Sequence, residues 1–210
     1  MYKNLLWDFD GTLFDSYPNM TESIRLALLK QGVDESAASL LFMIKRSVAQ
    51  CISHYSRKFS LDGRELYASY RFNEENSDWS AVMPYPGAET VCRCAVESGG
   101  RNFLYTHRGR KSYEYMDLHG LKKYFTGGVT RDDPFPMKPA PDAINYLVER
   151  YGMRRSETVM IGDRDIDILA AHAAGVAGCL FDPDGFYPDT AAEFHTRSME
   201  EIAAALLGPR

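Results

Sequence analysis

The stretch NLLWDFDGT at residues 4–12 is the part of this sequence that decides most about the fold. A short apolar run leads into a Gly-Thr pair, where the chain is expected to turn, and such a run is typical of a buried central strand. Asp8 and Asp10 are two residues apart, so on an extended segment their side chains point to the same side. Two crowded carboxylates are costly unless something compensates them, and a divalent cation with oxygen ligands commonly does so. The alternative is an ordinary acidic turn.

After residue 80, strand-like runs alternate with helical ones. Beyond the first strand, strands are predicted at 102–105, 128–130, 158–161 and 177–181. This alternation predicts an α/β fold, a doubly wound, Rossmann-like parallel sheet with helices on both faces. Ligands in such sheets bind beyond the carboxyl ends of the strands.

Between residues 15 and 80 the apolar residues recur at helical spacing, and no strand pattern interrupts them. This predicts two domains: an α/β core formed by 1–14 and 81–210, and a small helical domain at 15–80 inserted after the first strand.

The composition of the chain limits the kinds of partner that we expect the protein to bind. The net charge of −5 argues against a nucleic-acid partner, because nucleic-acid-binding proteins usually carry a basic surface. No apolar run is long enough to cross a bilayer, and the first residues show no signal-peptide pattern. The four scattered cysteines are typical of reduced thiols. We therefore expect a cytoplasmic protein with neither a membrane nor a nucleic-acid partner.

A second acidic group, GDRDID at 162–167, follows the predicted strand at 158–161. Asp163 and Asp167 are four apart at a predicted helix start, so they are expected to share one face. Capping of the helix is the alternative role, and we expect it of Asp165. Acids at the ends of two separate strands indicate a metal site. We expect Mg²⁺ rather than Zn²⁺, because no His/Cys cluster accompanies the acids.

Two further residues would complete a phosphate site. Thr106 ends the predicted strand at 102–105, and Lys138 stands before Pro139 at a predicted helix start, where an ammonium group and free N–H donors can meet an anion. Either residue alone is more often solvent-facing, so the prediction depends on their combination.

These segments resemble the four motifs of the haloacid dehalogenase superfamily, in the same order. They are DFDGT at 8–12, YTHR at 105–108, KPAPD at 138–142 and GDRDID at 162–167. The helical insertion resembles that of the subfamily with a small helical cap, which includes phosphoglycolate phosphatase and β-phosphoglucomutase.

The resemblance implies a division of labour among the acids. It implies that Asp8 is a nucleophile that becomes an aspartyl-phosphate and that Asp10 is the general acid and base. It also implies a Mg²⁺ site built from Asp8, Asp163 and the backbone carbonyl of Asp10. Asp167 would support the metal site or orient Lys138.

The resemblance also implies how the phosphoryl group is bound. Thr106 and Lys138, with the backbone N–H groups of Phe9 and His107, would hold the phosphoryl oxygens. His107 stands where the subfamily more often has Asn, so His107 and Arg108 either contact the substrate or pack. Among the basic residues of the insertion, Lys45, Arg46 and His54, we assign Arg46 to the substrate.

The function implied is a Mg²⁺-dependent phosphatase acting on a small phosphorylated metabolite. Asp10 favours phosphate-ester hydrolysis, because the dehalogenases of the superfamily lack an acid there. A phosphosugar mutase on the same core is the alternative. A non-catalytic phosphoacceptor, resembling a receiver domain, fits less well because it has no use for a cap. A non-catalytic binding module fits less well still, because no expected catalytic position is missing. We expect a monomer or a weak homodimer.

Overall fold

The computed structural model describes residues 1–208, which divide into two compact units. We call the first the sheet unit; it consists of Met1–Phe14 and the chain from Met83 onward. We call the second the helical unit; it is the continuous segment Asp15–Val82. The chain thus leaves the sheet unit shortly after its first strand and later returns to it.

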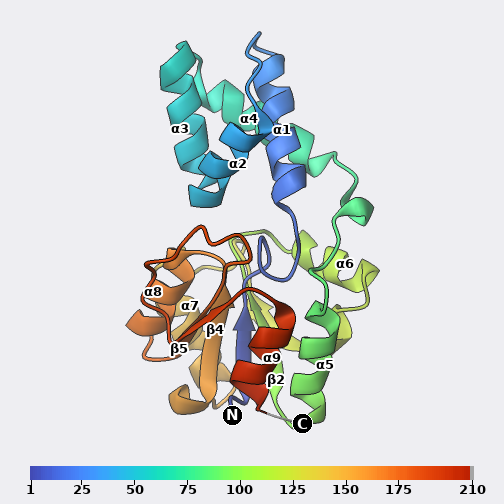
Figure 1. Cartoon of the computed structure of the whole chain (residues 1–210), viewed down its shortest axis with the longest axis vertical. Coiled ribbons are helices and arrows are strands. Elements are labelled where there is room, and N and C mark those ends of the chain that lie inside the picture. Colours follow the sequence, from blue (N-terminus) through green and yellow to red (C-terminus); the bar gives the residue numbers. More distant parts are fainter. Residues whose placement is uncertain (209–210) are drawn as a thin grey trace. The chain divides into compact units, whose positions relative to one another are not determined.

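The sheet unit is built on six parallel strands in the order β3-β2-β1-β4-β5-β6. Figure 1 labels three of them, β2, β4 and β5. The strands are β1 (Asn4–Trp7), β2 (Arg101–Tyr105), β3 (Phe125–Val129), β4 (Thr158–Gly162), β5 (Ala177–Phe181) and β6 (Phe194–Thr196). From β1 the chain adds β2 and β3 on one side of it and then adds β4 on the other. The strand order therefore reverses between β1 and β4, and ligands of such sheets bind at that point, beyond the carboxyl ends.

Strand β1 is short and apolar because both its faces are covered. All four of its residues are buried, and it pairs with β2 on one side and β4 on the other. A strand covered on both faces gains from a continuous apolar run rather than from alternation. The segment that follows β1 consequently leaves the sheet at its centre.

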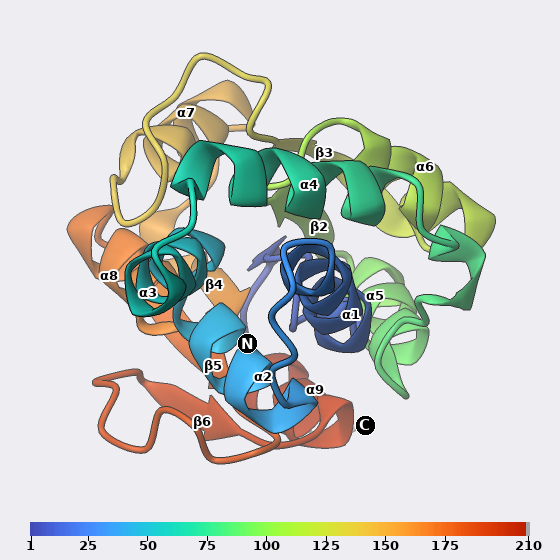
Figure 2. The same cartoon turned by 90° about the horizontal axis from the view of Figure 1, so that it is seen from above.

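Helices cover both faces of this sheet. The helices of the sheet unit are α5 (Ala88–Glu97), α6 (Lys111–Leu118), α7 (Asp142–Arg150), α8 (Asp165–Ala173) and α9 (Met199–Leu207). Helices α7 and α8 pack on one face in a core that includes Leu6, Phe103, Met160, Ile144 and Ala171. Figure 2 shows α7 and α8 on one side of the sheet and α5 and α9 on the other. The predicted doubly wound α/β fold is confirmed.

The helical unit contains four α-helices in its described residues. They are α1 (Tyr17–Leu29), α2 (Ala37–Arg46), α3 (Val48–Phe59) and α4 (Gly63–Glu75). Their apolar faces share one core, which includes Ile24, Leu40, Ile52 and Leu66. Three of the helix starts are capped by a side chain that accepts a backbone N–H: Ser36, Ser47 and Asp62.

The elements differ from the prediction in two places. The strand predicted at 128–130 begins earlier, at Phe125, because Gly127 and Gly128 give little strand signal. Gly128 is required there, since a Cβ would collide with the backbone of Leu104 on β2. Beyond the last predicted strand, the sheet gains β6 and its unit gains α9. Over residues 1–208, every helix is too short or too polar to span a bilayer.

Candidate active site

Asp8 comes directly after β1 and has two very different carboxylate oxygens. Its backbone N–H donates to the carbonyl of Ile161 (2.9 Å), which holds it beside the end of β4. Oδ1 accepts the N–H of Phe9 (2.8 Å) and lies 3.0 Å from Nζ of Lys138. Oδ2 is buried and has no hydrogen-bond partner among residues 1–208. Asp8 is therefore anchored through one oxygen, and the other is left for a ligand.

Lys138 is held from three directions. Besides Asp8, its ammonium group contacts Asp167 Oδ1 at 2.7 Å and lies over the ring of Tyr105, 4.7 Å from the centroid. The Lys138 side chain is 0% exposed. The other oxygen of Asp167, Oδ2, accepts the backbone N–H of Arg164 at 3.1 Å. Both oxygens of Asp167 are thus engaged, one by the ammonium group of Lys138 and the other by the backbone of Arg164.

The carboxylates of Asp8, Asp163 and Asp167 form a buried group that can hold a metal ion. Each offers an oxygen within 4.8 Å of the others. Burial raises the pKa of Asp8, and the charges of Asp167 and Asp10 raise it further, while Lys138 opposes the rise. A cation among these carboxylates would relieve this cost, so the residues fit a hard divalent ion.

Asp163 does not lie on the helix face where it was predicted. Helix α8 begins at Asp165, so Asp163 belongs to the turn before it, and its Oδ1 accepts the hydroxyl of Thr12 at 3.4 Å. The turn still brings Asp163 to the acidic group. Asp165 was predicted to cap the helix, but the N-cap is Arg164, whose backbone N–H is accepted by Asp167; Asp165 is the first residue of α8, where its carboxylate accepts the N–H of Ile166.

Gly162 is a residue whose importance the sequence analysis missed. A Cβ at this position would collide with the side chain of Asp167. Only glycine lets Asp167 fold back over the end of β4 and reach Lys138. The available signal was a glycine at a predicted strand end, directly before an acid.

The segment after β2 supplies Thr106 and His107. The N–H of Thr106 continues the sheet to Val129 (3.1 Å), and its hydroxyl oxygen accepts the N–H of Arg108 (3.0 Å). His107 Nε2 accepts the backbone N–H of Lys138 at 2.7 Å. Burial, and then the nearby Lys138 charge, lower the pKa of His107 to about 4. Its ring is thus a neutral acceptor that fixes the backbone of Lys138.

Asp10 and Phe9 also have defined partners. Asp10 pairs with the guanidinium of Arg108, at 2.8 Å for the shortest contact. The ring of Phe9 stacks on Phe14 with centroids 4.4 Å apart. The N–H of Phe9, which was predicted to bind a phosphoryl oxygen, donates to Asp8 in this structure.

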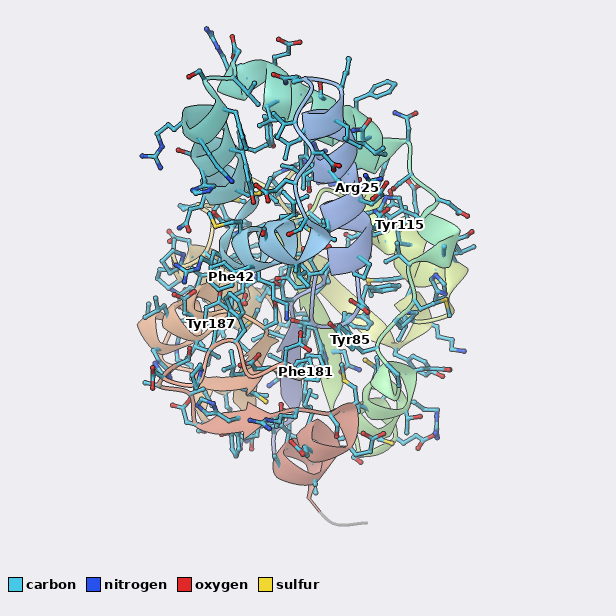
Figure 3. All side chains as sticks on the ribbon, turned by 45° about the horizontal axis from the view of Figure 1, so that its top comes forward. Arg25, Phe42, Tyr85, Tyr115, Phe181 and Tyr187 are labelled. Atoms are coloured by element: carbon cyan, nitrogen blue, oxygen red, sulfur yellow. The ribbon has the colours of Figure 1, made fainter. Side chains whose placement is uncertain are left out.

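The basic residues predicted in the insertion belong to the helical unit. Arg46 is exposed and lies over the ring of Phe42, 4.7 Å from its centroid; Phe42 is labelled in Figure 3. Lys45 is buried and lies over the ring of Tyr17. His54 packs edge to face on Tyr55. A role for Arg46 at the substrate stays a prediction.

Carboxylates after β1 and β4, a threonine after β2 and a buried lysine thus meet at the carboxyl edge of a doubly wound sheet. Open α/β sheets bind their ligands at this point, where the strand order reverses, so this group is the candidate active site.

Comparison with known proteins gives the family. Residues 5–181 match the family model described as haloacid dehalogenase-like hydrolase. The chain belongs to this family and is a hydrolase.

Individual relatives agree with this assignment. The chain is 31% identical over 189 residues to a phosphoglycolate phosphatase of Vibrio parahaemolyticus, covering 83% of this chain and 81% of that protein. A crystal structure of a hydrolase from Streptococcus pneumoniae superposes with a TM-score of 0.66 at 30% identity, over 86% of this chain and 92% of the other. A hydrolase of the family from Deinococcus radiodurans, crystallised with bound phosphate and sodium, has the same fold, with a TM-score of 0.79 at 18% identity over 98% and 95%.

Proposed function

We propose that this protein is a Mg²⁺-dependent phosphatase that hydrolyses small phosphomonoesters through an aspartyl-phosphate on Asp8. The observation that carries the proposal is the buried Asp8 carboxylate, which Lys138 and the N–H of Phe9 hold through Oδ1 while Oδ2 has no partner among residues 1–208. A fixed carboxylate with a bare oxygen is suited to act as a nucleophile. Relatives that are phosphoglycolate phosphatases support phosphate esters as the substrate class.

The reaction has two steps. In the first, a carboxylate oxygen of Asp8 forms a bond to phosphorus, the bond from phosphorus to the leaving oxygen breaks, and Asp10, which enters as the carboxylic acid, gives that oxygen its proton and becomes the carboxylate. In the second, a water oxygen attacks phosphorus, a water proton passes to Asp10, and the bond between Asp8 and phosphorus breaks. Inorganic phosphate leaves, and both aspartates return to their starting states.

The other residues stabilise charge and hold the metal. The ammonium group of Lys138 and the hydroxyl of Thr106 are placed to hold phosphoryl oxygens as charge develops on them. Asp8, Asp163 and the backbone carbonyl of Asp10 would hold Mg²⁺, an ion that prefers oxygen ligands. When bound, Mg²⁺ supplies positive charge that offsets the buried carboxylates and the phosphoryl oxygens.

The test is phosphate release from a panel of metabolites, beginning with 2-phosphoglycolate, with Mg²⁺ and with a chelator. Activity is expected with Mg²⁺ only. Asp8→Asn is expected to abolish it while leaving the folded protein intact by circular dichroism, and full activity in this variant would contradict the mechanism. Asp189→Asn, which changes an exposed carboxylate outside the acidic group, serves as the control. A mutase would instead convert sugar phosphates into isomers without releasing phosphate.

We further propose that the helical unit acts as a cap whose Arg46 contacts the substrate, as the family resemblance implies. The exposed guanidinium of Arg46 supports this proposal. Arg46→Ala is expected to raise KM with little change in kcat, whereas Arg57→Ala, an exposed arginine on α3, leaves both unchanged. An unchanged KM in Arg46→Ala would contradict it.

A further inference from the structure

Two nitrogens of the Arg108 guanidinium donate hydrogen bonds to the carboxylate of Asp10. Nη2 lies 2.8 Å from Oδ1 of Asp10, and Nε lies 3.2 Å from both Oδ1 and Oδ2. The two side chains are mostly buried, with 10% of Arg108 and 21% of Asp10 exposed. Forked contacts of this kind hold a carboxylate in one orientation, which a lysine cannot do.

Arg108 is itself fixed before it reaches Asp10. Its backbone N–H donates to the hydroxyl oxygen of Thr106 (3.0 Å), and its carbonyl accepts the N–H of Arg131 (3.0 Å). The guanidinium lies 5.5 Å from the centroid of the Phe9 ring, and that ring is stacked on Phe14. Arg108 is therefore part of the rigid edge of the sheet rather than a mobile surface arm.

The chemistry of the pair limits what Arg108 can do. A guanidinium does not give up a proton in proteins, so Arg108 cannot replace Asp10 in proton transfer. Lys138 already places a positive charge against Asp8. The paired hydrogen bonds from Arg108 fix where the oxygens of Asp10 lie. Proton transfer by Asp10 depends on that position.

We infer that Arg108 is a positioning residue that holds the carboxyl group of Asp10 in place, so that its protonated form can give the proton to the leaving group. The inference rests on the proposed function. From the sequence, Arg108 was expected either to contact the substrate or to pack. The inference gives it a third role, toward Asp10. A direct role of Arg108 as a ligand of the phosphoryl group is the competing explanation, and the experiment separates the two.

The experiment compares two leaving groups through kcat/KM, which reports the steps up to loss of the leaving group and not the later hydrolysis. p-Nitrophenyl phosphate releases a stabilised anion that needs no proton. An alkyl phosphate, taken as the one hydrolysed fastest in the metabolite panel, releases an alkoxide that does. Arg108→Gln is expected to lower kcat/KM for the alkyl phosphate by at least about tenfold more than for p-nitrophenyl phosphate.

Equal losses on the two substrates would overturn the inference. So would a loss confined to KM with weaker inhibition by inorganic phosphate, because that is the behaviour of a phosphoryl ligand. Arg108→Lys keeps the charge but not the fork, and it is expected to show the same dependence on the leaving group. This second variant keeps the inference testable if Arg108→Gln does not fold.

Arg110→Gln is the matched control. Arg110 lies two residues further along the same segment, has 70% of its side chain exposed, and pairs with Asp133 rather than Asp10. Its replacement is expected to change neither value of kcat/KM. A wild-type protein without Mg²⁺-dependent phosphate release would overturn the proposed function, and the role of Arg108 with it. An active wild type with equal losses in Arg108→Gln overturns the role of Arg108 alone.

Discussion

Oδ1 of Asp167 lies 2.7 Å from Nζ of Lys138, and both side chains are 0% exposed. The lysine charge is thus kept in a fully buried place by two carboxylates, since Asp8 contacts the same ammonium group. Ionic groups in such surroundings are strongly interdependent, because removal of one partner leaves another charge buried without compensation.

Replacement of Asp167 is therefore expected to cost stability as well as activity. Asp167→Asn keeps the size of the side chain but removes its charge, and the new amide turns an N–H donor toward Lys138 or Arg164. We expect the free energy of unfolding, measured in urea, to fall by about 3 kcal/mol. Asp165→Asn, on the exposed face at the start of the same helix, is expected to cost about 0.5 kcal/mol. Similar losses in the two variants would contradict the special role of the buried pair.

The His107 ring predicts a pH dependence of stability. The folded protein lowers its pKa to about 4, whereas histidine in an unfolded chain titrates near 6.5. Between these values the unfolded chain binds more protons, so stability rises with pH, is complete above about pH 6.5, and is lost toward pH 4. The difference in pKa corresponds to roughly 3 kcal/mol.

His107→Gln tests this, because Gln offers a non-titrating acceptor for the N–H of Lys138. Between pH 6.5 and pH 4 the free energy of unfolding of the wild type is expected to fall by roughly 3 kcal/mol more than that of the variant. His195→Gln, which replaces an exposed histidine on β6, should follow the wild type. Parallel curves for the wild type and His107→Gln would rule the explanation out.

The acidic group predicts that Mg²⁺ stabilises the fold. An ion that binds only the folded protein stabilises it by RT ln(1 + [ion]/Kd), so Tm rises with the logarithm of the ion concentration once that concentration exceeds Kd. We expect Mg²⁺ to raise the Tm of the wild type, and Asp163→Asn to need about tenfold more Mg²⁺ for the same rise. The measurement is a thermal unfolding series in Mg²⁺, with Asp189→Asn as a control that should match the wild type. A wild-type Tm that does not respond to Mg²⁺ would count against this site.

Asp10 is predicted to act in both steps of the proposed reaction. Asp10→Asn is expected to lower kcat by about 100-fold or more, because proton transfer to the leaving group and from water are both impaired. If the second step is slowed further than the first, the aspartyl-phosphate accumulates. Intact-protein mass spectrometry after rapid acid quench would then show one added phosphoryl group. Asp8→Asn, which removes the nucleophile, should show none.

Much of the site was predictable because a parallel sheet brings the carboxyl ends of its strands to one edge. Asp8, Thr106 and Asp163 each follow a strand that could be recognised from its apolar run, so their meeting required only the correct fold class. Lys138 was recognisable from its place before a helix. Local sequence patterns were thus sufficient to predict where the backbone of these residues lies.

The contacts that tune these residues were not predictable. Arg108 reaches Asp10 across 98 residues of sequence, and His107 turns its ring to the backbone of Lys138, 31 residues away. Such pairings depend on side-chain directions after folding, and no spacing in the chain signals them. Strand β6 was missed for another reason, since three residues are too few to establish an alternation.

The central place of β1 in the sheet has a consequence for how the protein is made. Strand β1 is synthesised before its two neighbours, β2 and β4, and the second of these begins only at Thr158. Until then β1 is an apolar segment without one of its two pairing partners, and it is exposed to misassociation. A nascent chain that stops before Asp163 therefore contains Asp8, the proposed nucleophile, but not the other two carboxylates of the acidic group. The complete acidic group should therefore form late in synthesis, in one step rather than gradually.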